Sequence, residues 1–157
     1  MKDKNINVVI EEMSFMNQKI YNLLLRADPS KKNMDEYTAR GKMFVAYYLG
    51  EIVGEYVLIK TRPGTMEIVN IAVDEAHQGK GLGKLLLKDA INKASEHGVK
   101  VLEIGTGNSS ITQLGLYQKM GFRITGIDRD YFVKHYEDPI HENGIPCVDM
   151  IRLSMDL

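Results

Sequence analysis

Residues 78–84, which read QGKGLGK, have the composition of a loop that binds an anion. Three glycines keep side chains out of the way, so a ligand can approach the backbone closely. The apolar residues that follow recur at helical spacing. This places the loop at a helix start, where backbone N–H groups have no intrahelical acceptor. These groups and the helix dipole both favour negative charge, and we therefore expect a pyrophosphate as the ligand.

Two known phosphate-binding motifs do not fit this loop. A P-loop requires a glycine, four residues and then Gly-Lys-Ser/Thr, but Gly83-Lys84 is followed by Leu85, and Gln78 stands where the first glycine should be. In the dinucleotide motif G-x-G-x-x-G, the third glycine would fall on Lys84. A glycine-rich turn that only begins a helix, and a small nucleotide-binding protein, remain as alternative interpretations.

Hydrophobic spacing predicts the elements that must position the loop. Strands are predicted at residues 6–10, 43–48, 52–60, 66–73, 99–104, 122–127 and 148–153, and helices at residues 15–27, 82–94 and 111–120. The strands between residues 43 and 73 read as an antiparallel meander. Residues 99–104 form a nearly continuous apolar run, which is typical of a central strand covered on both faces. The helical connection that follows implies a mixed α/β sheet flanked by helices.

The loop does fit the pattern Q/R-x-x-G-x-G/A, with Gln78, Gly81 and Gly83 at its defined positions. Residues 70–74 (NIAVD) precede it, and residues 116–122 (LYQKMGF) follow further along. Over about residues 43–122 the chain therefore resembles the GNAT superfamily of acetyl-coenzyme A dependent N-acetyltransferases. The resemblance implies a single N-acetyltransferase domain over residues 1–157. It also implies a GNAT-like fold, with a mostly antiparallel sheet of six or seven strands, one splayed parallel pair and about four helices.

The resemblance further implies that acetyl-coenzyme A is the cosubstrate. We expect no metal, because the lone Cys147 excludes a multi-cysteine metal site. Backbone groups of Ile71, Ala72 and Val73 would bind the pantetheine arm, and an N–H near Ile71 would polarise the thioester carbonyl. Such a donor contributes roughly 2.7 to 4 kcal/mol where it has been measured. The other predicted cofactor-binding residues are Gln78, Gly79, Lys80, Gly81, Leu82, Gly83, Lys84 and Asn108. A solvated helix start for each lysine, and a helix cap for Asn108, are the structural alternatives.

By the same resemblance, Tyr117 is the general acid that protonates the departing thiolate, and Glu103 or Glu67 is the base. A phenol of pKa near 10 donates to a thiolate of parent pKa about 8.5 only when it is well positioned. Glu103 interrupts the apolar run, where a carboxylate is costly unless it is paired or hydrated, and it is the preferred base. Structural roles for all three residues remain open.

The expected reaction is direct attack of a primary amine on bound acetyl-coenzyme A, and the acceptor is a small molecule, a protein N-terminus or a lysine. Deprotonating a lysine-type ammonium at pH 7 costs near 4.6 kcal/mol, whereas an α-amine near pKa 8 costs about 1.4 kcal/mol. A weak or water-relayed base therefore suits the α-amine better. A module of the same fold that binds acyl-coenzyme A without turnover is the alternative function.

The acidic and aromatic stretch at residues 128–142 precedes the last strand, and connections of this length often carry function. Its carboxylates, among them Asp128 and Asp130, are hypothesised to form one wall of a site for a cationic amine. His135 and His141 have no further ligand at metal-binding spacing, so ordinary surface histidines are the favoured interpretation.

Composition narrows the expected partners and location. Lys plus Arg number 20 and Asp plus Glu number 21, so no overall field attracts nucleic acid or an anionic membrane. The lone Cys147 excludes an internal disulfide and fits a reducing compartment, and no secretory leader or spanning segment is recognisable. We expect a cytoplasmic protein that binds neither nucleic acid nor membrane. The family resemblance allows a homodimer as well as a monomer.

Overall fold

The structure is a computed structural model and describes residues 7–157. Its helices are α1 (Gln18–Ala27), α2 (Lys31–Arg40), α3 (Leu82–Glu96), α4 (Ile111–Lys119) and α5 (Tyr131–His135), with a 3-10 turn, η1 (Glu75–His77). Its strands are β1 (Val8–Met13), β2 (Lys42–Tyr48), β3 (Glu51–Arg62), β4 (Thr65–Val73), β5 (Val101–Gly107), β6 (Arg123–Asp128), β7 (Ile140–Glu142), β8 (Ile145–Cys147) and β9 (Met150–Asp156). Among these residues, no helix is long and apolar enough to cross a membrane.

Seven strands form one sheet in the order β1-β2-β3-β4-β5-β9-β6, and β7 pairs with β8 in a separate hairpin. β4 and β5 are parallel, whereas β1 with β2, β2 with β3, and β9 with both of its neighbours are antiparallel. This confirms the predicted fold class. Five α-helices are present among the described residues where about four were expected, the shortest being α5.

The described residues divide into two compact units. Unit 1 contains the chain up to Ile59 together with Val69–Ala90, and unit 2 contains Lys60–Ile68 and Ile91–Leu157. Because β3, β4 and α3 each run from one unit into the other, these three elements are shared. The single domain expected over residues 1–157 stays a prediction.

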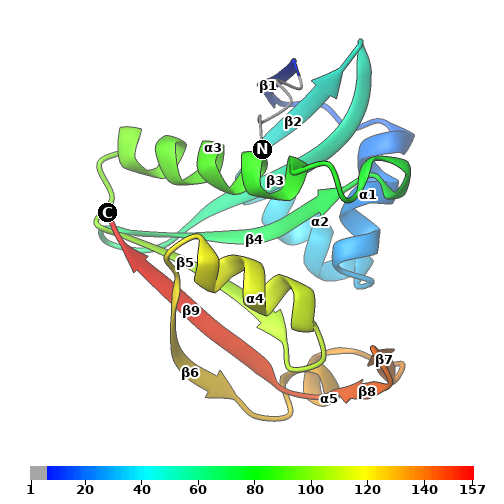
Figure 1. Cartoon of the computed structure of the whole chain (residues 1–157). Helices are drawn as coiled ribbons and strands as arrows, with labels where there is room; N and C mark the ends of the chain where they lie inside the picture. Colours follow the sequence, from blue (N-terminus) through cyan, green and yellow to red (C-terminus); the bar gives the residue numbers. More distant parts are fainter. Residues whose placement is uncertain (1–6) are drawn as a thin grey trace. The chain divides into compact units, whose positions relative to one another are not determined.

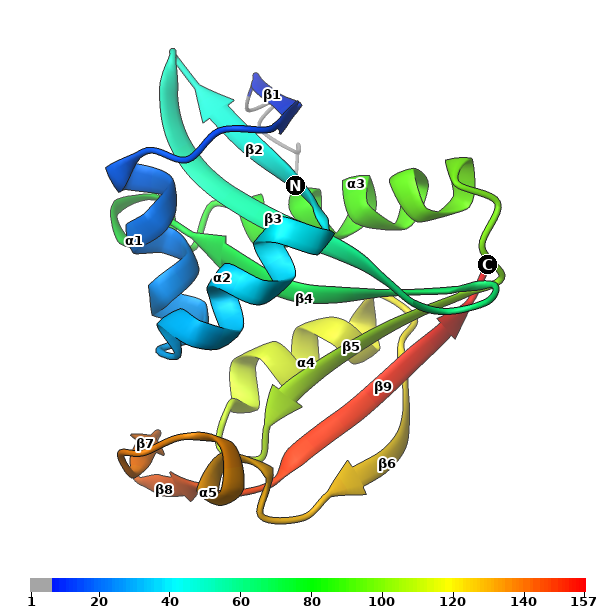
Figure 2. The same ribbon diagram turned by 180° about the vertical axis from the view of Figure 1, so that it is seen from behind.

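In unit 1, helices cover both faces of the strands (Figures 1 and 2). α1 and α2 lie on one face and α3 lies on the other. On the α3 side, Tyr56 stacks on Phe44 with ring centroids 4.8 Å apart, and its hydroxyl donates to Asp89 at 2.6 Å. The apolar core on the α1 and α2 side consists of Ile20, Leu24, Met34, Tyr37, Met43, Val45, Val57 and Ile59.

The N-terminal part of unit 1 differs from the prediction in both of its helices. The helix expected from residue 15 begins at Gln18, because Asn17 is extended and its side chain accepts a hydrogen bond from the Ile20 N–H at 2.9 Å. Phe15 and Met16 therefore precede the helix and are 60% and 41% exposed. α2 was not predicted, since it buries only Met34 and Tyr37 and has no continuous apolar stripe. Ile6, in the strand expected at residues 6–10, lies outside the described residues.

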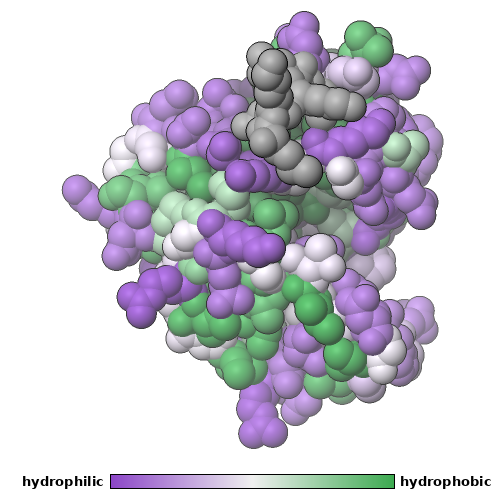
Figure 3. Space-filling view, viewed as in Figure 1, coloured by the Kyte–Doolittle hydropathy of each residue, from purple (hydrophilic) through white to green (hydrophobic). Residues whose placement is uncertain are grey.

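In unit 2, the parallel ladder joins only four residue pairs, from Thr65 with Val101 to Ile68 with Ile104. β5 was expected to be covered on both faces, and this is wrong. Leu102 and Ile104 are buried, but Val101, Glu103 and Gly105 are only half-buried, so the strand alternates. An alternating strand has one core face and one face that can hold charged residues. Figure 3 shows hydrophobic side chains gathered on the α4 side of this unit.

The segment expected as a long connection before the last strand is folded. It contains α5 and the β7–β8 hairpin, whose turn places Asn143 and Gly144 at φ 56° and 72°. Two successive left-handed residues are the signature of a type I′ hairpin turn, and Asn-Gly is its preferred sequence.

Candidate active-site elements

In unit 1, the glycine loop joins β4 to α3. The Asp74 N–H donates to the Val53 carbonyl at 2.8 Å, so the strand end is held before the chain turns. Gly79 and Gly81 then have φ values of 77° and 81°, which side-chain-bearing residues rarely adopt. α3 begins where the Leu85 N–H donates to the Gly81 carbonyl at 3.1 Å. The sequence thus folds here as predicted, because glycine alone tolerates both turns.

The same loop has the donors and charge to hold a phosphate group. Within residues 7–157, no backbone carbonyl accepts a hydrogen bond from the N–H groups of Gly79 to Lys84. A Cβ placed on Gly79 or Gly81 would meet no atom within 4 Å, so the backbone is open to a ligand there. Lys80 and Lys84 are exposed and form no ion pair within the described chain. Donors, space and positive charge all suit a pyrophosphate.

In unit 2, Tyr117 lies on α4 and is 5% exposed, with its ring edge-on to Phe122 at a centroid distance of 6.3 Å. Burial raises the pKa of the Tyr117 phenol well above its ordinary value, and the nearby negative charge of Glu142 raises it further. No hydrogen bond within the described residues engages its hydroxyl. The phenol therefore keeps its proton at physiological pH, as a general acid must.

The two predicted bases lie side by side in unit 2. Glu67 on β4 and Glu103 on β5 are register partners, so their side chains share one face of the sheet. Glu103 forms an ion pair with Arg62, and Glu67 approaches Arg152 with 3.5 Å between Oε1 and Nη1. The two side chains are similarly buried, at 17% and 19% exposure. Both carboxylates thus have the charged partner that their burial requires.

Asn108 binds a segment far along the chain. Its Nδ2 donates to the Pro146 carbonyl at 3.1 Å, and its Oδ1 accepts from the N–H groups of Val148 and Asp149 at 2.9 and 3.0 Å. The N-cap position of α4 is occupied by Ser110, so the predicted capping alternative does not describe Asn108. Its contact with a cofactor stays a prediction.

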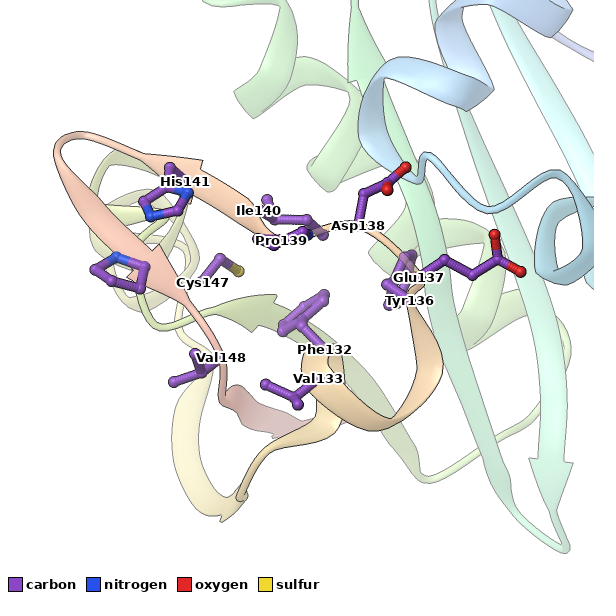
Figure 4. Close-up of a pocket in the computed structure, with 11 residues that line it drawn as sticks. Phe132, Val133, Tyr136, Glu137, Asp138, Pro139, Ile140, His141, Cys147 and Val148 are labelled. Atoms are coloured by element: carbon purple, nitrogen blue, oxygen red, sulfur yellow. The ribbon is translucent and has the colours of Figure 1, made fainter.

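Unit 2 also contains a pocket of about 160 Å³ between α5 and the β7–β8 hairpin (Figure 4). The Cys147 thiol lies inside it near Phe132 and Ile140, whereas the carboxylates of Glu137 and Asp138 point away from the interior. The sequence indicated the acidic residues of this region, but it did not reveal the apolar interior. The remaining lining residues are Val133, Tyr136, Pro139, His141, Pro146 and Val148.

A model of the acetyltransferase (GNAT) family matches residues 12–122, which is more than half of the chain. The chain belongs to the GNAT acetyltransferase family. This confirms the resemblance inferred from the loop and from the motif around Tyr117, both of which lie within the matched residues.

Relatives of this GNAT acetyltransferase extend the similarity to nearly the whole chain. The uncharacterized N-acetyltransferase YvbK of Bacillus subtilis is 59% identical over 141 residues, covering 90% of this chain and 91% of the relative. A crystal structure of a Bacillus subtilis acetyltransferase in complex with CoA is 56% identical, with a TM-score of 0.93 and coverage of 96% and 99%. A GNAT acetyltransferase of Elizabethkingia anophelis with acetyl-CoA bound is 50% identical, with the same TM-score and coverage.

In this GNAT acetyltransferase the predicted site residues are divided between the two units. Unit 1 holds Ile71, Ala72, Val73 and the glycine loop, and unit 2 holds Glu67, Glu103, Asn108 and Tyr117. The arginines that pair with the two glutamates were not predicted. No local signal reveals them, because Arg62 on β3 and Arg152 on β9 each lie two strands away from the paired glutamate in the order of the sheet.

Proposed function

We propose that this protein transfers an acetyl group from acetyl-coenzyme A to a primary amine by direct attack in a ternary complex. The glycine loop carries the proposal, because its open backbone N–H groups and its two lysines, which form no ion pair within the described part of the chain, suit the pyrophosphate of coenzyme A. The CoA and acetyl-CoA bound by two structures of at least 50% identity support it. The N-acetyltransferase name of YvbK favours catalysis over a module that only binds acyl-coenzyme A. A buried free thiol at Cys147 accords with a cytoplasmic location, which we also propose.

Each predicted residue then has a defined role. Residues 79–84 and Gln78 hold the phosphates, and backbone groups of Ile71, Ala72 and Val73 together with Asn108 bind the pantetheine arm. Glu103 or Glu67 accepts the proton of the attacking amine. Tyr117 donates its proton to the thiolate that leaves as the C–S bond breaks and the new C–N bond forms. The phenolate regains a proton from solvent after the products depart.

The acceptor class follows from the cost of deprotonating the amine. An amine of pKa near 8 is ready to attack at pH 7 for about 1.4 kcal/mol, whereas a lysine-type amine costs about 4.6 kcal/mol. We therefore expect acceptors of the first kind to react faster. A panel of α-amines and alkylamines, with detection of the released thiol, tests the proposal. If none of these amines leads to release of coenzyme A, the proposal is contradicted.

Substituting Gly81 by Ala is expected to weaken coenzyme A binding at least tenfold. The new methyl group occupies the open side of the loop, and the left-handed backbone strains by roughly 1 to 2 kcal/mol. Gly64→Ala is the matched control, since Gly64 has a φ of 72° and equally open surroundings in the β3–β4 turn. Thermal shifts with coenzyme A measure the effect, because ligand at 100 times Kd stabilises by about 2.7 kcal/mol. An equal loss of coenzyme A affinity in both variants would count against the proposed ligand. So would a larger thermal shift of the wild type with ATP or NAD than with coenzyme A.

Substituting Glu103 by Gln is expected to lower kcat/KM for the amine by about 10²-fold, because the amide cannot accept the proton. Glu67→Gln is an unusually close control, since Glu67 is the register partner of Glu103 and has nearly the same exposure and an arginine partner of its own. We expect less than a tenfold loss in the control. Steady-state kinetics across pH 6 to 9 compare kcat/KM in the two variants. A greater loss of kcat/KM in Glu67→Gln than in Glu103→Gln would assign the base to Glu67 instead.

A further inference from the structure

We infer that the pocket between α5 and the β7–β8 hairpin binds the apolar body of a cationic amine, and that Glu137 and Asp138 hold the ammonium at its rim. This inference rests on the proposed function, for which it names the class of acceptor. It concerns unit 2 alone, in which all of the lining residues lie.

The size and chemistry of the pocket define the group that fits. Its volume of about 160 Å³ is close to that of an engineered cavity of roughly 150 Å³ that binds benzene. Phe132, Ile140 and the Cys147 thiol supply an interior without formal charge (Figure 4). An aromatic ring or a branched alkyl group therefore suits it, whereas a sugar or a phosphate would lose its hydrogen bonds there.

Gly107, at the end of β5, lies directly against two of the residues that line the pocket. A Cβ at Gly107 would lie 2.4 Å from the Cys147 Sγ and 3.6 Å from Phe132 Cε2. Any larger residue at this position would displace the Cys147 thiol, which lies in the pocket, whereas its contact with the Phe132 ring would be an ordinary one. Gly107 thus keeps the interior accessible, and it places the pocket at the end of the strand that also carries Glu103.

The rim carries the charge that a cationic amine requires. The carboxylates of Glu137 and Asp138 point outward from the pocket, and no ion pair within the described residues neutralises either of them (Figure 4). A ligand that places its ring inside the pocket would contact the apolar interior with that ring, and its ammonium outside would face the acidic rim. A neutral ligand with the same ring gains only the first contact.

The hairpin also connects the pocket to the predicted general acid. Glu142, next to the lining residue His141, accepts a hydrogen bond from the Ser110 hydroxyl at 3.0 Å. Ser110 is the N-cap residue of α4, the helix that carries Tyr117. The negative charge of Glu142 contributes to the raised pKa of the Tyr117 phenol. The pocket is therefore attached to the helix on which proton donation is proposed, as expected of an acceptor site.

The single cysteine of the chain makes the pocket directly observable. Protein labelled with ¹³C only at the β-carbon of cysteine gives one carbon NMR signal, from Cys147, which can be followed during titration. The ligands are 2-phenylethylamine, ethylamine with the same ammonium and no ring, and 2-phenylethanol with the same ring and no charge. We expect 2-phenylethylamine to shift the Cys147 signal saturably. Its affinity should be at least tenfold higher than that of ethylamine, because binding buries the ring.

A double variant, Glu137→Gln with Asp138→Asn, tests the rim. It should remove the preference for 2-phenylethylamine over 2-phenylethanol, whereas Glu96→Gln, an exposed carboxylate at the end of α3, should preserve it. No shift of the Cys147 signal, or equal affinities for ethylamine and 2-phenylethylamine, would overturn the inference. The wild-type protein could instead show the ring-dependent shift and yet acetylate none of the amines. That result would contradict the proposed function but would still support the ligand class inferred for the pocket.

Discussion

Replacing Tyr117 with Phe is expected to lower kcat by about 10²- to 10⁴-fold, the usual contribution of a positioned general acid. The affinity for coenzyme A should stay within about twofold of wild type, because only one hydroxyl is removed. That hydroxyl has no hydrogen-bond partner within residues 7–157, so its loss leaves no buried group unpaired and folding should be unaffected. Pre-steady-state and steady-state kinetics measure kcat, and coenzyme A binding is measured separately by calorimetry.

The control for this variant is Tyr21→Phe, a half-buried tyrosine that packs against the core of unit 1. It should leave kcat unchanged. Because burial and Glu142 raise the pKa of Tyr117, the phenol stays protonated and its titration should not limit the rate between pH 6 and 9. Wild-type turnover in Tyr117→Phe would remove the residue from the mechanism, whatever its burial.

Substituting Glu55 by Gln is expected to stabilise the protein increasingly as pH rises. Glu55 lies on β3 opposite Val45 and is fully buried, and neither of its carboxylate oxygens has a hydrogen-bond partner among residues 7–157. Desolvation therefore raises its pKa well above the usual value of 4.5. The folded state holds the proton more tightly than the unfolded state does, so wild-type stability falls as pH rises from the unfolded pKa through the folded one.

Within that pH window the wild type loses about 1.4 kcal/mol of unfolding free energy per pH unit from this residue, whereas glutamine does not titrate. Urea unfolding at pH 5, 7 and 9 should show the two proteins diverging with pH. Glu51→Gln, an exposed glutamate at the start of the same strand, should run parallel to wild type. Glu55→Met should be more stable still, by about 1 to 3 kcal/mol, because it also removes the unpaired polar atoms. A pH-independent difference between wild type and Glu55→Gln would show that the carboxyl is ionised or hydrated.

Local features of the sequence were sufficient to predict the glycine loop, most strands and the family. The left-handed turns at Gly79 and Gly81 and the helix that follows them depend on neighbouring residues, so spacing alone reveals them. The failures are local as well. α2 is too polar for its periodicity to be read, and the apolar run at residues 99–104 proved to have a single buried face, because burial alternates along β5.

Long-range pairing decided the rest. The sequence identifies Glu67, Glu103 and Asn108 as candidates. Only the strand register places the two glutamates side by side, and only the folded sheet brings a separate arginine to each of them. Asn108 finds its partners about 40 residues away, and the apolar pocket forms only when α5 and the hairpin close over Gly107. Glu55 looks like any strand glutamate until the core surrounds it. Composition and spacing thus determine which chemical groups are available, whereas their partners and their solvation depend on residues that only tertiary folding brings together.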